Sequence, residues 1–91
     1  MENVKADQTS AIKTKIRSFV VENFLFGTDD PTLTDDASFL ETGVIDSTGI
    51  LELISFVESE YGIKVEDAEM LPENLDSLSH ISVFVARKAS A

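Results

Sequence analysis

Residues 46–62 read DSTGILELISFVESEYG, which is the clearest helical pattern in the chain. Asp46 is a favoured residue type for the N-cap of a helix, and Gly62 is a typical stop at a C-terminus. The stretch therefore predicts a helix from Asp46 to Tyr61 that packs one face against a core. The apolar side chains that recur at the spacing of that face are Ile50, Ile54, Val57 and Tyr61, with Leu53 beside them.

Ser47 stands at the start of this helix. If Asp46 is the N-cap, its carboxylate accepts a hydrogen bond from the first turn, and Ile45 and Ile50 occupy the two positions of a hydrophobic staple. Ser47 is then the first helical residue, with its hydroxyl outward beside backbone N–H groups at the positive end of the helix dipole. Such a place suits a phosphate-linked group. The alternative is a serine that only begins a helix.

Two further segments have the apolar spacing of helices. The first runs from Asp7 to Phe26 and ends near Gly27, and the second runs from Asp76 to about Lys88. Both predict amphipathic helices that share one core. Their core-facing side chains are predicted to be Ile12, Ile16, Phe19, Val20 and Phe26 in the first, and Leu78, Ile81, Phe84 and Val85 in the second.

The segments between these helices lack helical period. Residues 28–45 contain Asp-Asp-Pro at 29–31 and Asp-Asp at 35–36, and they predict a long loop. Residues 66–70, which precede Pro72, allow one or two helical turns. The side chains that could pin the long loop to the core are Leu33, Phe39, Leu40, Val44 and Ile45.

Together these elements predict an all-α fold, a four-helix bundle with a long loop between helices one and two and a short helix three. At 91 residues the chain has the size of one domain. We expect that domain to span residues 1–91 and its ends, 1–6 and 89–91, to fray.

The formal net charge is −10, and from Glu22 to Asp76 the only basic residue is Lys64. Such a surface repels nucleic-acid phosphates and anionic lipid headgroups and attracts basic protein patches. No stretch approaches the roughly 20 apolar residues of a membrane span. Without cysteine, the chain has no disulfide, catalytic thiolate or cysteine-bound zinc. We expect a monomeric, cytoplasmic protein that binds neither nucleic acid nor membrane.

Residues 39–48 read FLETGVIDST, which closely resembles the pattern around the modified serine of the acyl carrier protein family. Residues 60–65, EYGIKV, and 73–78, ENLDSL, resemble that family's exit from helix two and its entry into helix four. The resemblance covers nearly the whole chain. It implies the family's helical fold, and it identifies Ser47 as the serine to which a phosphopantetheinyl transferase attaches 4′-phosphopantetheine.

The resemblance also implies a function. The thiol of that group would carry an acyl or aminoacyl group as a thioester, in lipid, polyketide or another specialised biosynthesis. The implied partners are an acyl- or aminoacyl-loading ligase and acyltransferases with basic docking patches, and the chain itself would not be an enzyme.

One departure from the family pattern concerns the partners. The residue after the serine is most often Leu in the family, whereas this chain has Thr48 and then Gly49, a weak helix former. Partners that read these positions would meet a smaller, more polar surface. This difference favours a specialised carrier over the housekeeping carrier of fatty-acid synthesis.

A second serine, Ser77 in the tripeptide Asp76-Ser77-Leu78, matches the commoner three-residue form of the motif. Ser47 is preferred because it follows the lead-in that contains Gly43, because its helix is acidic, and because two more helices can follow it. We therefore interpret Ser77 as a helix cap.

The helix that begins at Ser47 carries candidates for partner contacts. Its glutamates could pair with basic enzyme surfaces or could simply be solvated. Phe56 lies outside the apolar arc, where it could anchor a partner or pack under the long loop. The predicted partner-binding residues are Asp46, Thr48, Glu52, Phe56, Glu58 and Glu60.

Other chemistry has weaker support. His80 is the only histidine, and no G-x-S-x-G elbow accompanies it, so we interpret it as an ordinary helix residue. A calcium loop from Asp30 to Glu41 would lack the acidic third and fifth residues and the glycine at position six. A small acidic calcium-binding or adaptor bundle without a covalent group is the alternative to a carrier.

Overall fold

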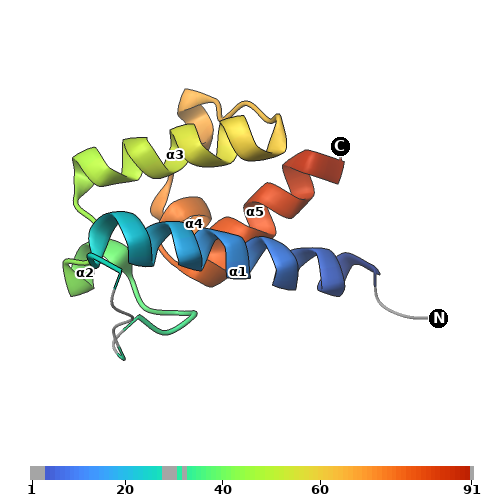
Figure 1. The fold of residues 1–91 in the computed structure, drawn as a ribbon. Helices are drawn as coiled ribbons and strands as arrows, with labels where there is room; N and C mark the ends of the chain where they lie inside the picture. The colour runs from blue at the N-terminus through green and yellow to red at the C-terminus, as the bar shows by residue number, and fades with distance from the viewer. Residues whose placement is uncertain (1–3, 28–30, 32, 91) are drawn as a thin grey trace.

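The computed structural model describes residues 4–27, 31 and 33–90. Every regular element among these residues is a helix, which confirms the predicted all-α bundle. In Figure 1, α1 lies in front of α4 and α5, and α3 runs above it. The elements are α1 (Val4–Phe24), α2 (Phe39–Thr42), α3 (Ser47–Tyr61), the 3-10 helix η1 (Asp67–Glu69), α4 (Pro72–Leu75) and α5 (Leu78–Ser90).

One core joins the three long helices, and each helix contributes one face to it, as the apolar spacing predicts. Phe19, Ile50 and Tyr61 are half-buried at its edge. The buried apolar side chains are Ile12, Ile16 and Val20 of α1, Leu53, Ile54 and Val57 of α3, Leu78, Ile81, Phe84, Val85 and Ala86 of α5, and Leu33, Phe39, Ile45, Val65 and Leu75 of the segments between them.

The end of α1 differs from the prediction. The helix ends at Phe24 rather than Phe26, and the Phe26 side chain is 95% exposed instead of facing the core. The reason is the turn that closes the helix, in which the Gly27 N–H donates to the Val21 carbonyl at 2.9 Å. In this turn both Phe26 (φ 56°) and Gly27 (φ 82°) have left-handed backbone, which directs the Phe26 ring away from the bundle.

The predicted uninterrupted loop before α3 is wrong, because it contains the one-turn helix α2. Ser38 caps α2, and its Oγ accepts from the Glu41 N–H at 3.1 Å. Gly43 ends α2 in the left-handed conformation, with φ of 78°. Of the side chains predicted to pin this segment, Leu33, Phe39 and Ile45 are buried, Val44 is half-buried and Leu40 is exposed.

Asp76 joins α2 by hydrogen bonds to the segment between α4 and α5. Its Oδ1 accepts from the Leu40 N–H at 3.1 Å, and its carbonyl accepts from the Phe39 N–H at 2.9 Å. The Ser38 hydroxyl also donates to its carboxylate. Asp76 does not begin the last helix as predicted. It is the C-cap of α4, Ser77 accepts from the His80 N–H, and α5 starts at Leu78.

The predicted short helix three is divided in two. Residues 67–69 form the predicted turn before Pro72, as the 3-10 helix η1, and Pro72 then begins a second short helix, α4. Proline fits there because the first residue of a helix needs no N–H donor.

The chain ends extend the outer helices. Residues 4–6 and 89–90, which were predicted to fray, belong to α1 and α5, and residues 1–3 and 91 lie outside the described part of the chain.

We expect Phe26→Asn to raise the free energy of unfolding by about 1 kcal/mol, because asparagine tolerates left-handed backbone better than phenylalanine and the exposed ring contributes no burial. Urea unfolding of both proteins measures this difference. Leu25→Asn, at the half-buried neighbour, is the control and should lower stability. A loss of stability in Phe26→Asn would contradict the exposed position of the ring.

Candidate functional site

The start of α3 has the predicted geometry. Asp46 is the N-cap, with extended backbone (φ −93°, ψ −177°), and its Oδ1 accepts from the Gly49 N–H at 2.7 Å. Ser47 is the first residue of the helix and is exposed, and Ile45 before the cap is buried. The serine hydroxyl is therefore accessible at the positive end of a fifteen-residue helix.

Gly49 is buried in the first turn of α3, between the cap and the end of α1. A Cβ atom on this residue would lie 2.7 Å from Ile45 Cγ2, 2.8 Å from Phe24 Cε1 and 3.3 Å from Asp46 Oδ1. Gly49 is thus required for close packing and forms no part of the surface that a partner could read. Of the two residues that depart from the family pattern, only Thr48 is exposed.

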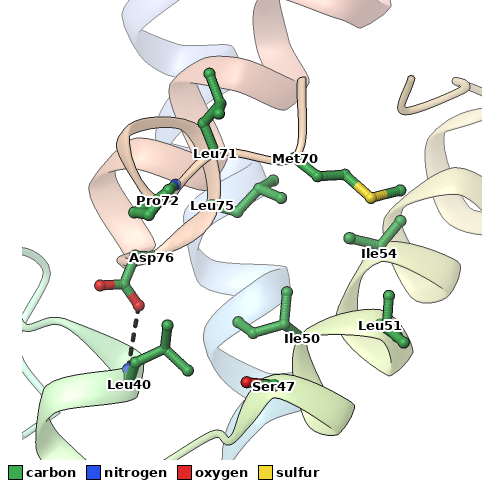
Figure 2. A pocket seen from close by; sticks show the side chains of 10 residues that line it. All are labelled: Leu40, Ser47, Ile50, Leu51, Ile54, Met70, Leu71, Pro72, Leu75 and Asp76. Atoms are coloured by element: carbon green, nitrogen blue, oxygen red, sulfur yellow. Dashed lines mark hydrogen bonds between the residues drawn. The ribbon is translucent and has the colours of Figure 1, made fainter. Parts of the chain in front are cut away.

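An apolar groove of about 180 Å³ opens beside Ser47 (Figure 2). Side chains of α3 form one wall, and residues 70–75 form the other. Among the described lining residues only Ser47 and Asp76 are polar, and the Asp76 carboxylate is occupied by the Leu40 N–H. The lining consists of Leu40, Ser47, Ile50, Leu51, Ile54, Met70, Leu71, Pro72, Leu75 and Asp76.

Sequence reasoning missed this groove, because half of its lining lies outside any periodic segment. A signal was nevertheless present, since Met70 and Leu71 are large apolar residues in a stretch that is rich in acidic residues. Both are exposed, as are Leu40 and Leu51 across the groove. Exposed apolar side chains that cluster around a cavity indicate a binding surface.

Glu69 holds the outer wall of the groove in place. Its Oε1 accepts from the Glu66 N–H at 3.0 Å, and Lys88 Nζ of α5 donates to both carboxylate oxygens, at 2.9 and 3.2 Å. The backbone hydrogen bond from Glu66, followed by the bond from Lys88, lowers the pKa of Glu69 below its ordinary value of 4.5.

Ser77 occupies a different environment from Ser47. It is 1% exposed, and its Oγ accepts from the His80 N–H at 3.0 Å and contacts His80 Nδ1 at 2.9 Å. This is the geometry of a helix cap, which agrees with our interpretation of Ser77. A buried hydroxyl already bonded to its own helix is a poor acceptor for an enzyme-transferred group.

The predicted acidic docking residues have different surroundings. Glu60 pairs with Lys15 of α1 at 2.7 Å, a hydrogen bond and charge attraction that raise the pKa of Lys15. Glu58 Oε2 accepts from the Val65 N–H at 2.9 Å. Glu52 is exposed and makes no hydrogen bond or ion pair with the described residues. Of the three, Glu52 has the carboxylate that is most available to a partner.

Phe56 packs against α1 rather than under the long loop. Its ring stacks on Phe19 with a centroid distance of 4.2 Å and an interplanar angle of 17°. Phe19 in turn meets Phe24 edge to face, at 6.1 Å and 69°. The ring is half-buried in this cluster, and a role in partner binding stays a prediction.

Two further expectations concern metals and membranes. The described residues contain no group of three His, Cys, Asp or Glu side chains that could hold a metal ion. Asp29, Asp30 and Thr32 of the acidic loop lie outside the described part of the chain. Within that part, none of the helices combines the length and the hydropathy that a membrane span requires.

Comparison with known proteins places the chain near two bacterial acyl carrier proteins. It is 29% identical to the acyl carrier protein of Thermotoga maritima over 77 residues, which are 85% of this chain and 90% of that protein. It is 30% identical to the acyl carrier protein of Akkermansia muciniphila over 78 residues, which are 86% of this chain and 92% of that protein. No family model matches the chain.

We expect Gly49→Ala to destabilise the protein by about 1 kcal/mol. Overpacking costs about 1–3 kcal/mol, whereas the gain in helix propensity returns at most about 1 kcal/mol. Urea unfolding measures the difference. The same substitution in a Phe24→Leu background should cost less, because the ring that approaches the new methyl group is gone. Equal costs in both backgrounds would contradict a contribution of the Phe24 ring to that cost.

We expect the stabilisation by Glu69 to depend on pH. Its pKa is lowered in the folded protein, so its contribution is fully present above the unfolded-state pKa and is lost as the pH falls through the folded-state pKa. Wild-type protein should therefore be more stable than Glu69→Gln at pH 7, and the difference should shrink below pH about 4.5. Chemical unfolding across this range tests the prediction, and a constant difference would contradict it.

Proposed function

The chain belongs to the acyl carrier protein family, and on this premise we propose that it is a carrier whose Ser47 hydroxyl is the attachment point for 4′-phosphopantetheine. The observation that supports this proposal is the contrast between the two candidate serines. Ser47 is exposed at the start of α3, whereas Ser77 is buried and bonded within its own helix.

The residues around Ser47 fit such a group. Among the described residues, the Asp46 carboxylate accepts only from the Gly49 N–H, so the helix dipole and the first backbone N–H groups of α3 can face a phosphate on the Ser47 oxygen. The groove beside Ser47 offers apolar surface to whatever the arm carries. When bound, 4′-phosphopantetheine supplies a thiol on a flexible arm that holds an acyl group as a thioester.

The groove favours an aliphatic acyl cargo over an aminoacyl one. Apart from Ser47 and Asp76, its walls are leucine, isoleucine, methionine and proline side chains, which offer no hydrogen-bond partner to a buried amine or hydroxyl. Burying such a group without a partner costs about 1–3 kcal/mol, whereas each buried CH₂ contributes about 0.8 kcal/mol. A saturated chain therefore gains from the groove, and a polar cargo stays outside it. This preference points to lipid metabolism.

The partners would be a phosphopantetheinyl transferase, a loading ligase and acyltransferases. With a net charge of −10 and an exposed Glu52 on the helix of Ser47, the chain would attract basic surfaces on these enzymes. Asp46 and Thr48 flank the serine on the same exposed turn. The carrier would act as the substrate of each partner and would catalyse no step itself. We extend the proposal to a single cytoplasmic carrier domain that acts as a monomer.

We expect incubation with coenzyme A, Mg²⁺ and a broad-specificity phosphopantetheinyl transferase to add the mass of one phosphopantetheine. Ser47→Ala should abolish the addition because the acceptor oxygen is gone, and Ser77→Ala should retain it. Intact-protein mass spectrometry gives the answer. The proposal fails if the wild type gains no mass, or if Ser77→Ala loses the addition while its circular dichroism stays that of the folded protein.

A further inference from the structure

The outer wall of the groove belongs to the least buried part of the described chain. We call residues 66–74 the strap. None of its side chains is buried, although Val65 and Leu75 on either side of it are. The buried residues that anchor the strap to the core therefore lie at its two ends, and between them Met70 and Leu71 are 37% and 42% exposed.

Most hydrogen bonds of the strap stay within it. Glu66 and Glu69 exchange the two bonds of a capping box, and the Asn74 amide donates to the Glu69 carbonyl at 2.9 Å. The backbone N–H groups of Met70 and Leu71 also turn back to strap carbonyls. These bonds give the strap its local shape, and they do not hold it against the rest of the bundle.

A single pair of side chains attaches the strap to the rest of the bundle. Among the described residues, the bonds between Glu69 and Lys88 are the only hydrogen bonds or ion pairs that lead from the strap to another helix. Lys88 stands in the last turn of α5, where its charge is favourable with the helix dipole. The two side chains are 31% and 25% exposed, and ion pairs with this access to water are weak and opened by salt.

We propose that the Glu69–Lys88 pair positions the strap and thereby sets the length of acyl chain that the groove accepts. This inference rests on the proposed carrier function. Met70 and Leu71 follow Glu69 directly and line the groove, and the Met70 side chain points toward Ile54 of α3 across it (Figure 2). When the pair is closed, the strap keeps the groove at its observed size. When the pair opens, the strap can move outward without exposing any buried side chain, and the groove lengthens.

The opposite wall cannot adapt in the same way. Behind Leu51 and Ile50 the same helix buries Leu53 and Val57 in the core, so any outward shift of α3 would open the core as well. Local opening takes place where few apolar contacts are lost. The strap is therefore the wall that yields, and its one ion pair controls how easily it does so.

The test compares Lys88→Met, which removes the charge, with Lys88→Arg, which retains it. Lys13→Met is the matched control, because Lys13 makes a surface ion pair with Asp35 at 3.2 Å and does not line the groove. In the unmodified protein, hydrogen exchange should be about two- to fivefold faster at the strap amides of Lys88→Met, the range expected for loss of a partly exposed ion pair. Lys88→Arg and Lys13→Met should exchange as the wild type does.

The second measurement uses protein loaded at Ser47. A broad-specificity transferase and acyl-coenzyme A esters from hexanoyl to hexadecanoyl give a series of acylated carriers, and thermal unfolding gives the Tm of each. In the wild type, Tm should rise with chain length until the groove is filled and then level off. In Lys88→Met the levelling point should move to longer chains, and in Lys88→Arg and Lys13→Met it should not.

The outcomes separate the two proposals. A levelling point shared by wild type and Lys88→Met overturns the role of the ion pair, as does strap exchange that Lys88→Met leaves unchanged. Absence of loading at Ser47 overturns the carrier function. Loading with no effect of any chain on wild-type Tm overturns the placement of cargo in the groove, and with it the inference about its length.

Discussion

The close approach of α1 and α3 at Gly49 is the constraint on which the candidate site depends. The Phe24 ring lies where a Cβ atom would project, and Ile45 fills the other side of the same residue. The Gly49 N–H is also the donor that Asp46 caps. Helix capping and helix packing therefore act on one residue, so the first turn of α3 has a defined position relative to α1. Because Ser47 lies in this turn, the same contacts define its position.

Local and distant interactions differ in how far the sequence reveals them. The helix from 47 to 61 was predicted to within a residue because its cap, its apolar period and its glycine stop all lie within the helix or next to it. The one-turn helix α2 is too short for its apolar residues to show a helical period. Its start is held by Asp76, a partner 38 residues from Ser38 and 36 from Leu40. Such a helix follows from tertiary structure, and inspection of its own residues could not have predicted it.

The parts of the candidate site also differ in whether local sequence predicts them. The place of Ser47 at the start of α3 followed from local sequence. The preference for Ser47 over Ser77 came from the residues before Ser47, the acidity of its helix and the two helices that can follow it, and the structure adds that Ser77 is buried. The groove could not be predicted, because its outer wall comes from a strap without regular spacing. Gly49 was interpreted as a weak helix former at the surface, whereas it is a packing residue. The sequence alone does not distinguish a glycine that only weakens a helix from one that permits close packing, because the difference depends on the neighbours of that residue in space.

Rigidity is distributed unevenly around the groove, and the distribution suits a carrier. An attachment point must be presented to several enzymes in one orientation, whereas the groups that it bears differ in length. The chain meets the first requirement with a capped helix whose inner face is buried. It meets the second with a strap that has no buried side chain. Buried apolar contacts are insensitive to screening by salt, whereas a partly exposed ion pair is not. On the proposed role of the ion pair, salt would act on the wall of the groove more than on the buried packing that positions the serine.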